Sequence, residues 1–293
     1  MIELERNSEL KNSLKIFFTN PTAVVGFIIF IIYVIDALIV QFAPWLLGIK
    51  NPNVLQENFV NPIPLPPSAQ HPLGTTYPGI DLLKAIEAAI RIDLAFSLII
   101  VLGGAAIGAT LGIISGYIGG LLDDVLMRIT DIFFAIPFLV LAIAVGFALG
   151  RTYESMIIAL IIVWWPLYAR YARAQTLSIK RTPFIDAARI AGVRDFKIMI
   201  RHILPNVLPP IFIQISLDLG SVMVIFSTLA FIGLIPNASL PELGYLTSLG
   251  LNYLQSAPWA VIFPGLAITL FALAVNLMGD GLRDVIDPRR RSS

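Results

Sequence analysis

The sequence predicts an all-α integral membrane protein with six transmembrane helices, and three observations support this fold class. The chain has 293 residues, of which 57% are hydrophobic and only 13% are charged, whereas about 25% charged residues is usual in a soluble domain. Its mean hydropathy of +0.84 is more than one water-soluble core of this size can hide. Six apolar runs are present, each near the roughly 20 residues that cross a bilayer.

The composition excludes several other classes of protein. Cys is absent from the sequence, which excludes disulfide frameworks, thiol redox chemistry and thiolate metal sites. The 21 Gly and 20 Pro follow no three-residue period, and the high apolar content excludes a disordered chain. The net charge of +1 says little as a total, so the information lies in the positions of the charges.

The first apolar run covers residues 23–47 and predicts the first transmembrane helix, after a cytoplasmic segment of residues 1–22. The run is too long for a cleaved signal peptide and no A-x-A site follows it, so we expect a retained signal anchor. Residues 48–93 then form an external loop, which is Pro-rich and extended at first. From Gly79 onward, charged residues three or four apart lie opposite an apolar face, which predicts an amphipathic helix at the membrane surface.

Residues 94–281 are predicted to form a core of five further helices, followed by a cytoplasmic tail over residues 282–293. The third of these helices starts at Ser155 and reaches spanning length only when it is extended through Ala172. The five predicted spans are 94–118, 132–150, 155–172, 210–235 and 259–278.

The distribution of Lys and Arg predicts the orientation of the chain. Six spans place both termini on one side of the membrane. With the termini on the cytoplasmic side, 16 of the 20 basic residues lie in cytoplasmic segments. Cytoplasmic loops carry an excess of Lys and Arg, so we expect a multi-pass protein of the cell membrane with both termini in the cytoplasm.

Small residues mark one face of the second predicted span. Gly104, Gly108, Gly112, Gly116 and Gly120 recur every fourth residue, which places them along one stripe of a helix. Lipid tails give helices no hydrophobic reason to associate, so close approach of the two backbones must supply the attraction. We expect this stripe to pack against another helix; a hinge or a pore-lining role is the alternative.

Two carboxylates interrupt otherwise apolar spans. Asp36 lies in the first span and Asp218 in the fifth. A charge near the bilayer centre costs about 2.5–3.5 kcal/mol on insertion scales, so each carboxylate should face a partner or a wet cavity. Asp218 is a candidate for lining a translocation path, with structural pairing to a polar neighbour as the alternative.

The segment 177–206, between the fourth and fifth spans, predicts two short helices outside the membrane. Thr182 is a good N-cap and Pro183 suits the first helical position, whereas Gly192 ends the first helix. We expect the second helix to stop before Pro205. Small apolar residues on the first helix form a compact ridge that fits a groove on a partner protein, with an interfacial helix on anionic lipid as the alternative. The predicted ridge consists of Phe184, Ala187, Ala188 and Ala191, flanked by Arg189 and Arg194.

This segment resembles the EAA loop in the membrane subunits of binding-protein-dependent ABC importers. The resemblance covers nearly the whole chain and is specific to the second, C-type, permease of the dipeptide/oligopeptide branch. The strings that carry it are His71-Pro72-Leu73-Gly74-Thr75, Ser115-Gly116-Tyr117, Asp186-Ala187-Ala188, His202-Ile203-Leu204-Pro205-Asn206 and Gly279-Asp280-Gly281-Leu282-Arg283-Asp284.

The resemblance implies the type I ABC importer permease fold, with the segment 177–206 as a coupling helix seated in a cleft of a cytoplasmic ATPase subunit. Closure of the ATPase pair on ATP would drive the permease pair between inward-facing and outward-facing states. The residues that the resemblance assigns to this coupling are Phe184, Asp186, Ala187, Ala188, Arg189, Ala191, Gly192 and Arg194.

The chain departs from the family pattern at a few positions. Asp186 stands where the family usually has Glu, and Leu243 stands where it has an aromatic residue. Phe226 takes the place of an acidic residue common in the fifth span and is, with Asp218, a candidate for the translocation path. The resemblance implies di- or oligopeptides as cargo, and oligosaccharides or nickel complexes are the alternatives.

The partners that the resemblance implies are a homologous second permease subunit forming a heterodimer, two cytoplasmic ATPase subunits, an external substrate-binding protein and membrane lipids. ATP and Mg would be held by the ATPase subunits, because this sequence contains no P-loop string. The sequence shows no pattern that pairs a nucleophilic residue with a general base, so we expect no catalytic residue and no cofactor on this chain.

Other site types find little support in the sequence. His71 and His202 are predicted on opposite sides of the membrane, so we expect no metal site. The run Arg289-Arg290-Arg291 is explained more simply as a topology anchor than as a nucleic-acid site. An ion-coupled secondary carrier working alone is the alternative from another class, but such carriers show paired repeats with broken helices.

Overall fold

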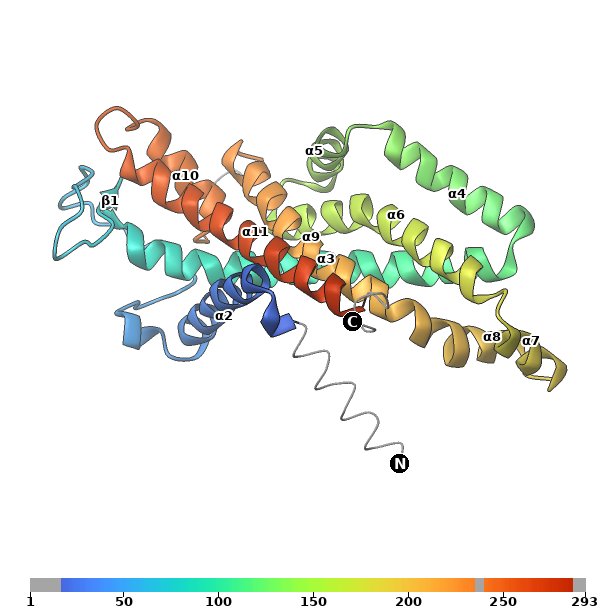
Figure 1. The fold of residues 1–293 in the computed structure, drawn as a ribbon. Helices are drawn as coiled ribbons and strands as arrows, with labels where there is room; N and C mark the ends of the chain where they lie inside the picture. Colours follow the sequence, from blue (N-terminus) through green and yellow to red (C-terminus); the bar gives the residue numbers. More distant parts are fainter. Residues whose placement is uncertain (1–16, 235–239, 287–293) are drawn as a thin grey trace. The chain divides into compact units, whose positions relative to one another are not determined.

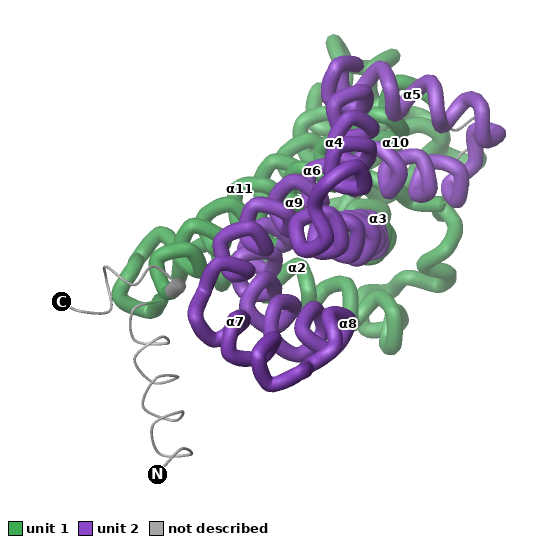
Figure 2. The backbone as a smooth tube through the Cα atoms, turned by 90° about the vertical axis from the view of Figure 1, so that its right-hand side faces the viewer, with its two compact units in different colours: residues 1–98, 216–293 green, residues 99–215 purple. Residues whose placement is uncertain are grey.

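A computed structural model of the chain describes residues 17–234 and 240–286. Almost all of the regular structure in these ranges is helical (Figure 1). The chain forms two compact units, which Figure 2 colours separately: unit 1 comprises residues 1–98 and 216–293, and unit 2 comprises residues 99–215. The helices α3 and α9 each run from one unit into the other, and each unit is described by itself below.

Unit 1 begins with α2 (Pro21–Phe42), which corresponds to the first predicted span. The Oδ1 atom of Asn20 accepts hydrogen bonds from the backbone N–H groups of Thr22 and Ala23 at 3.2 and 3.4 Å, and so caps the helix. The helix ends earlier than predicted, because the rest of the apolar run forms a short 3-10 turn, η1 (Pro44–Leu47), which closes at Gly48.

The loop after η1 is largely irregular, as predicted, but it contains a small antiparallel sheet of β1 (Thr75–Thr76) and β2 (Ile80–Asp81). Directly after β2, α3 (Leu82–Ile118) runs for 37 residues without a break. The expectation of a separate amphipathic surface helix is therefore wrong. No Gly or Pro occurs between residues 82 and 102, so nothing in the sequence interrupts the helix before the span begins.

The remaining elements of unit 1 pack closely on one another, and the last of them also packs on α2. They are the second half of α9 (Leu204–Phe231), α10 (Leu243–Leu251) and α11 (Trp259–Ile286). A Cβ atom at Gly26 would lie 2.5 Å from the Ala274 carbonyl oxygen, so α2 and α11 meet backbone to backbone. The Tyr33 hydroxyl adds a hydrogen bond of 2.7 Å to the Ala267 carbonyl. The contact between α2 and α11 therefore follows the small-residue rule for helices in lipid.

In unit 2, the predicted span over residues 132–150 is not one helix. It is divided between α4 (Gly120–Ala135) and α5 (Phe138–Leu149), which are bent by 97° relative to each other. The break falls at Pro137, which lacks a backbone N–H and whose ring disfavours a helical conformation in the residue before it. The prediction of a continuous span over 132–150 is therefore wrong.

The glycine stripe of α3 lies against α6 (Tyr153–Ile179) in unit 2. Cβ atoms at Gly108 and Gly112 would each lie 2.3 Å from a backbone carbonyl oxygen of α6. A Cβ at Gly116 would lie 3.0 Å from another α6 carbonyl, and one at Gly104 would lie 3.2 Å from the Trp164 Cβ. Gly120 does not belong to the stripe, because it has a positive φ of 62° and starts α4.

After α6, the chain forms α7 (Pro183–Ile190), α8 (Asp195–Ile198) and a π-helical turn, η2 (Met199–Ile203), which leads directly into α9. The prediction that Pro205 stops the second short helix is wrong. The wider π turn carries the helix past the proline, and the Leu204 N–H bonds to the Met199 carbonyl. The Asn206 side-chain amide donates to the His202 carbonyl at 2.7 Å. Pro209 and Pro210 follow in the first turns of α9.

Five helices of the described chain are long and apolar enough to cross a membrane, and the bent pair α4–α5 makes six if it counts as one span. The prediction of an all-α membrane protein is confirmed. Residue 235, the predicted end of the fifth span, lies outside the described residues, as do most of the predicted cytoplasmic termini.

Candidate functional site

The α7–α8 hairpin, residues 183–198, is the segment that the sequence singles out for partner docking, and it lies wholly within unit 2. Thr182 and Pro183 start α7 as predicted, although the Thr182 hydroxyl donates to the Ile179 carbonyl at 2.6 Å and does not cap the helix. Gly192 follows the helix with a φ of +75° and no neighbouring atom within 4 Å of a Cβ at that position. The predicted ends of the first short helix are therefore correct.

The inner face of the hairpin is apolar and buried. Ile185 and Ile198 are fully buried, and Ala188 is 9% exposed. The prediction that Ala188 belongs to the exposed ridge is therefore wrong. Helical spacing places Ala188 three residues after Ile185, and the larger side chain determines which face turns inward.

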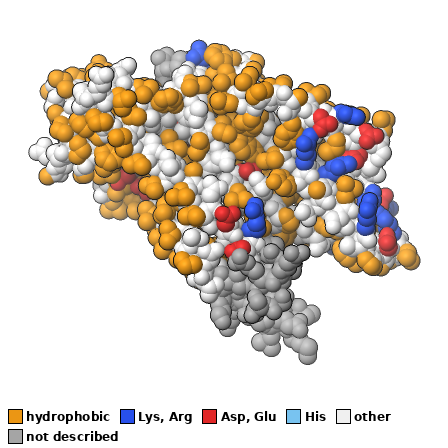
Figure 3. Space-filling view, turned by 45° about the horizontal axis from the view of Figure 1, so that its top comes forward, with side chains coloured by type: hydrophobic (Ala, Val, Ile, Leu, Met, Phe, Trp, Pro, Cys, Tyr) orange, Lys and Arg blue, Asp and Glu red, His pale blue; other side chains and the backbone are white. Residues whose placement is uncertain are grey.

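The outer face presents large apolar side chains among charges. Ile190, Phe196 and Phe184 are 88%, 70% and 47% exposed. The predicted contact residues Ala187, Ala191, Asp186, Arg189 and Arg194 are also exposed. Asp186 and Arg189 form an exposed ion pair of 3.3 Å along the helix. Figure 3 shows charged side chains gathered at the end of unit 2 that carries α7 and α8.

Tyr117, at the end of α3, anchors the hairpin. Its hydroxyl donates a hydrogen bond to the Asp195 carboxylate at the start of α8. Lys180 donates to the Tyr117 backbone carbonyl. The Lys180 ammonium and the Arg189 guanidinium both lie 5.5 Å from the centre of the Tyr117 ring. Contact with the Tyr117 side chain raises the pKa of Arg189 above its usual value, so this residue is cationic on the outer face.

A second polar cluster fixes the helices beneath this anchor. Arg173 of α6 donates two hydrogen bonds to the Asp123 carboxylate of α4, at 2.6 and 2.7 Å. The Ser115 hydroxyl of α3 donates to the same carboxylate. Because bidentate pairs are the stronger and more directional ones, α3, α4 and α6 form a rigid frame for the hairpin.

The sequence reasoning missed Tyr117, Asp123, Arg173 and Asp195 as parts of this site. The string Ser115-Gly116-Tyr117 carried part of the family resemblance and was the one available signal. Tyr117 and Asp195 are 78 residues apart in the chain, so sequence spacing could not pair them.

The two candidates for the translocation path lie inside unit 1. Asp218 is 5% exposed and Phe226 is fully buried. The Phe226 ring packs edge to face on the Phe96 ring at 5.3 Å. Asp36 is half-buried, and its Oδ2 atom accepts no hydrogen bond from the described residues.

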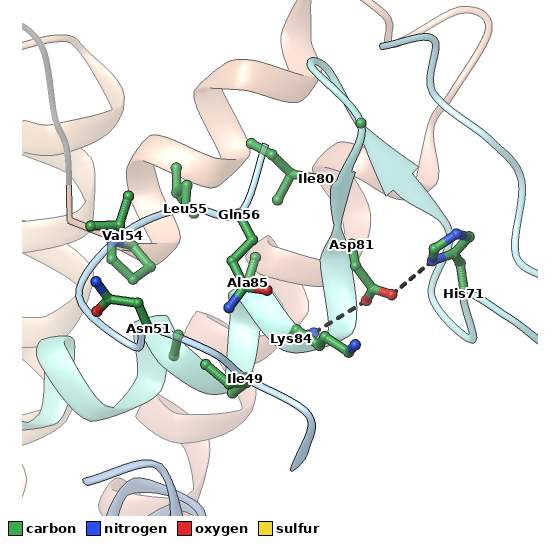
Figure 4. Close-up of a pocket in the computed structure, with 13 residues that line it drawn as sticks. Ile49, Asn51, Val54, Leu55, Gln56, His71, Ile80, Asp81, Lys84 and Ala85 are labelled. Carbon is green, nitrogen blue, oxygen red and sulfur yellow. Dashed lines mark hydrogen bonds and ion pairs between the residues drawn. The ribbon is translucent and has the colours of Figure 1, made fainter. Parts of the chain in front are cut away.

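Unit 1 also holds a solvent-open pocket of about 120 Å³ between the loop after η1 and the start of α3. Figure 4 shows Asp81 between His71 and the first turn of α3. The Asp81 carboxylate pairs with the His71 ring nitrogen Nδ1 at 2.7 Å and accepts from the Lys84 backbone N–H at 3.3 Å. These contacts fasten the loop to α3. Within the described residues, no group of three or more side chains is suited to hold a metal ion.

Comparisons with known proteins give consistent matches along the chain. A family model described as binding-protein-dependent transport system inner membrane component matches residues 108–292. A second, described as the N-terminal TM domain of oligopeptide transport permease C, matches residues 8–67.

Three named relatives are similar over most of their length. A dipeptide transport system permease protein of Alkalihalophilus pseudofirmus is 37% identical over 273 residues, covering 93% of this chain and 88% of the relative. A probable D,D-dipeptide transport system permease protein of Escherichia coli K12 is 38% identical, covering 88% and 86%. A glutathione transport system permease protein of Pectobacterium atrosepticum is 39% identical, covering 77% and 75%.

Proposed function

The chain belongs to the family of binding-protein-dependent transport system inner membrane components, and from this premise we propose that it is the non-catalytic permease subunit of an ATP-driven importer of di- or oligopeptides. The observation that carries the proposal is the α7–α8 hairpin, a rigidly anchored surface segment whose exposed face is rich in apolar side chains. Such a face suits a groove on a partner protein.

The assembly that we propose contains a homologous second permease, two cytoplasmic ATPase subunits and an external substrate-binding protein. ATP and Mg are held by the ATPase subunits. Both termini and the hairpin lie in the cytoplasm, an orientation supported by the 16 of 20 basic residues that it places there. No nucleic acid takes part.

In the proposed mechanism the hairpin acts as a lever. Closure of the ATPase pair on ATP displaces the hairpin, and the anchoring of Asp195 to Tyr117 passes the displacement to the frame of α3, α4 and α6. The permease pair then alternates between outward-facing and inward-facing states. The proposed docking residues are Phe184, Asp186, Ala187, Arg189, Ile190, Ala191, Arg194 and Phe196, with Gly192 as the turn between the helices.

The substitution Ile190→Glu tests this docking surface. Ile190 is 88% exposed, so the change removes an apolar contact without disturbing the core. We expect the ATPase subunits that co-purify with the permease to fall by about tenfold or more, as for loss of a central apolar contact. The matched control is Val60→Glu, because Val60 is 96% exposed on the predicted external loop and should keep the full complex. If Ile190→Glu retains its ATPase subunits and its ATP-driven transport, the docking assignment is refuted.

The cargo is proposed from the relatives, which are named for dipeptides, glutathione and peptides. Mass spectrometry of the ligand that the purified external binding protein retains tests this part. A retained peptide supports the proposal, whereas an oligosaccharide or a nickel complex overturns the cargo and leaves the machinery intact. A permease that transports without ATPase subunits would instead be an ion-coupled carrier.

A further inference from the structure

Two fully buried carboxyl groups meet at the start of α10 in unit 1. Asp93 comes from α3, and Glu242 is the residue before α10; both side chains have no exposed surface. Asp93 Oδ2 accepts a hydrogen bond of 3.0 Å from the Leu243 N–H, and Glu242 Oε2 accepts one of 2.6 Å from the Tyr245 N–H. Each carboxyl thus uses one oxygen to cap the same helix N-terminus.

The second oxygen of each carboxyl has no partner. Asp93 Oδ1 and Glu242 Oε1 are buried and accept no hydrogen bond from the described residues. Almost every buried polar atom in a folded protein finds a partner. Two orphaned oxygens on neighbouring carboxyl groups therefore point to a bound species that bridges them.

The surroundings supply no compensating charge. Ser97 lies one turn after Asp93 on α3, and Ser227 of α9 faces Glu242; both hydroxyls are buried and uncharged. A Cβ at Gly244 would lie 1.9 Å from the Ser227 carbonyl oxygen, so the start of α10 is pressed against α9. Among the described residues, no Lys, Arg or His pairs with either carboxyl, and Glu242 supplies the charge that acts on Asp93.

A helix N-terminus favours one negative charge, but two carboxylates in one buried site cannot both ionise without a large cost. We propose that Asp93 and Glu242 form a proton-binding site, in which one shared proton joins the two carboxyl groups and fastens the start of α10 to α3. The proton bridges the two free oxygens, and the remaining single negative charge stays on the helix N-terminus.

The expected pH dependence follows from Glu242, which lies outside the membrane-spanning helices. Burial raises its pKa from 4.5 to about 7, although the backbone N–H groups at the start of α10 oppose the rise. A carboxyl whose pKa is raised in the folded state stabilises that state fully below its ordinary pKa, and the stabilisation is lost as the pH rises through about 7. In the proposed orientation α10 lies on the outer side, so external alkaline pH would loosen α10.

Infrared spectroscopy of the intact complex in nanodiscs tests the shared proton directly. We expect the wild-type protein to show a protonated-carboxyl band at about pH 6 that disappears by about pH 8.5. The substitutions Asp93→Asn and Glu242→Gln should each shift the frequency of the band at pH 6, because the remaining carboxyl is still buried but no longer has a second carboxyl with which to share the proton. Glu57→Gln is the matched control, since Glu57 is exposed.

Amide exchange of residues 243–251 supplies a readout that needs only the wild-type protein. After correction for intrinsic exchange, we expect these amides to exchange about tenfold faster at pH 8.5 than at pH 6. A wild-type protein without the band, or with a band whose frequency neither substitution changes, overturns the proposal. It is also overturned if Na⁺ or Ca²⁺ restores slow exchange at pH 8.5, because a metal ion would then occupy the site. The infrared band and the amide exchange of residues 243–251 do not depend on whether the Ile190→Glu variant loses its ATPase subunits.

Discussion

Adding a single methyl group at Gly112 should separate two helices of unit 2. The Cβ of Gly112→Ala would lie 2.3 Å from the Ala169 carbonyl oxygen and 2.8 Å from the Ala172 Cβ. Since non-bonded heavy atoms prefer about 3.5–4.0 Å, α3 and α6 must move apart by about 1 Å. Both obstacles are parts of a packed helix and have no rotamer that could relieve the contact.

The expected cost combines two opposing effects. Inserting a methyl group into a close-packed contact costs about 1–3 kcal/mol, and Ala in place of Gly in a helix returns about 1 kcal/mol. A gap of about 1 Å also removes up to half of the dispersion energy at the neighbouring glycine contacts. We therefore expect a net loss near the upper end, about 2 kcal/mol, and a melting temperature lower by about 4–8 °C.

Thermal unfolding of the purified protein, followed by Trp fluorescence, measures this loss. Gly103→Ala is the control in the same helix, because the three atoms nearest to its Cβ would be side-chain atoms of Ile161, at 2.9, 3.1 and 3.5 Å, and not backbone atoms. The control should change the melting temperature by no more than about 1 °C. Equal melting temperatures for the two variants would refute the close backbone contact between α3 and α6.

Three further substitutions test the hairpin and its frame. Asp123→Asn breaks the bidentate contact with Arg173 and should cost about 2 kcal/mol in thermal unfolding. Asp131, on the same helix as Asp123, forms an exposed ion pair with Arg170, so the control Asp131→Asn should cost less than about 1 kcal/mol. Equal losses for the two variants would contradict the role of the frame. Gly192→Ala forces a side chain onto a φ of +75° and should destabilise the hairpin by about 1–2 kcal/mol in amide exchange. Gly265→Ala, on a helix with open space, should not destabilise the protein. Tyr117→Phe should speed amide exchange of the hairpin by about three- to tenfold while the melting temperature stays nearly constant, and unchanged exchange would argue against this anchor.

The sequence predicted those features that depend on local signals. Apolar length identified five of the six predicted spans as single helices. Pro183 and Gly192 marked the ends of α7, because Pro fixes a φ that suits the first helical turn and Gly readily adopts the positive φ that follows the helix. The four-residue glycine period indicated which face of α3 approaches another helix. The family strings added the fold, which no periodicity could supply, and they are the basis of the docking role that we propose for the hairpin.

Features that depend on tertiary contacts were not predictable. Phe184, Ile185 and Ile190 are all large and apolar, so the sequence of α7 did not show that Ile185 and Ala188 are the residues that turn inward. The pairing of Asp93 with the start of α10 joins residues 150 apart in the chain. The break at Pro137 and the continuation past Pro205 show the same residue type with opposite outcomes, because only the second is accommodated by a π turn.

The prolines at the start of α9 affect how easily that segment bends. Pro205, Pro209 and Pro210 remove three amide donors from the first seven residues of the helix. The segment is therefore stiff along its axis, because the helix is continuous, but compliant in bending, because fewer backbone bonds resist a change of angle. A push from the hairpin would travel along α9, while the angle at this joint could change with fewer backbone hydrogen bonds having to break.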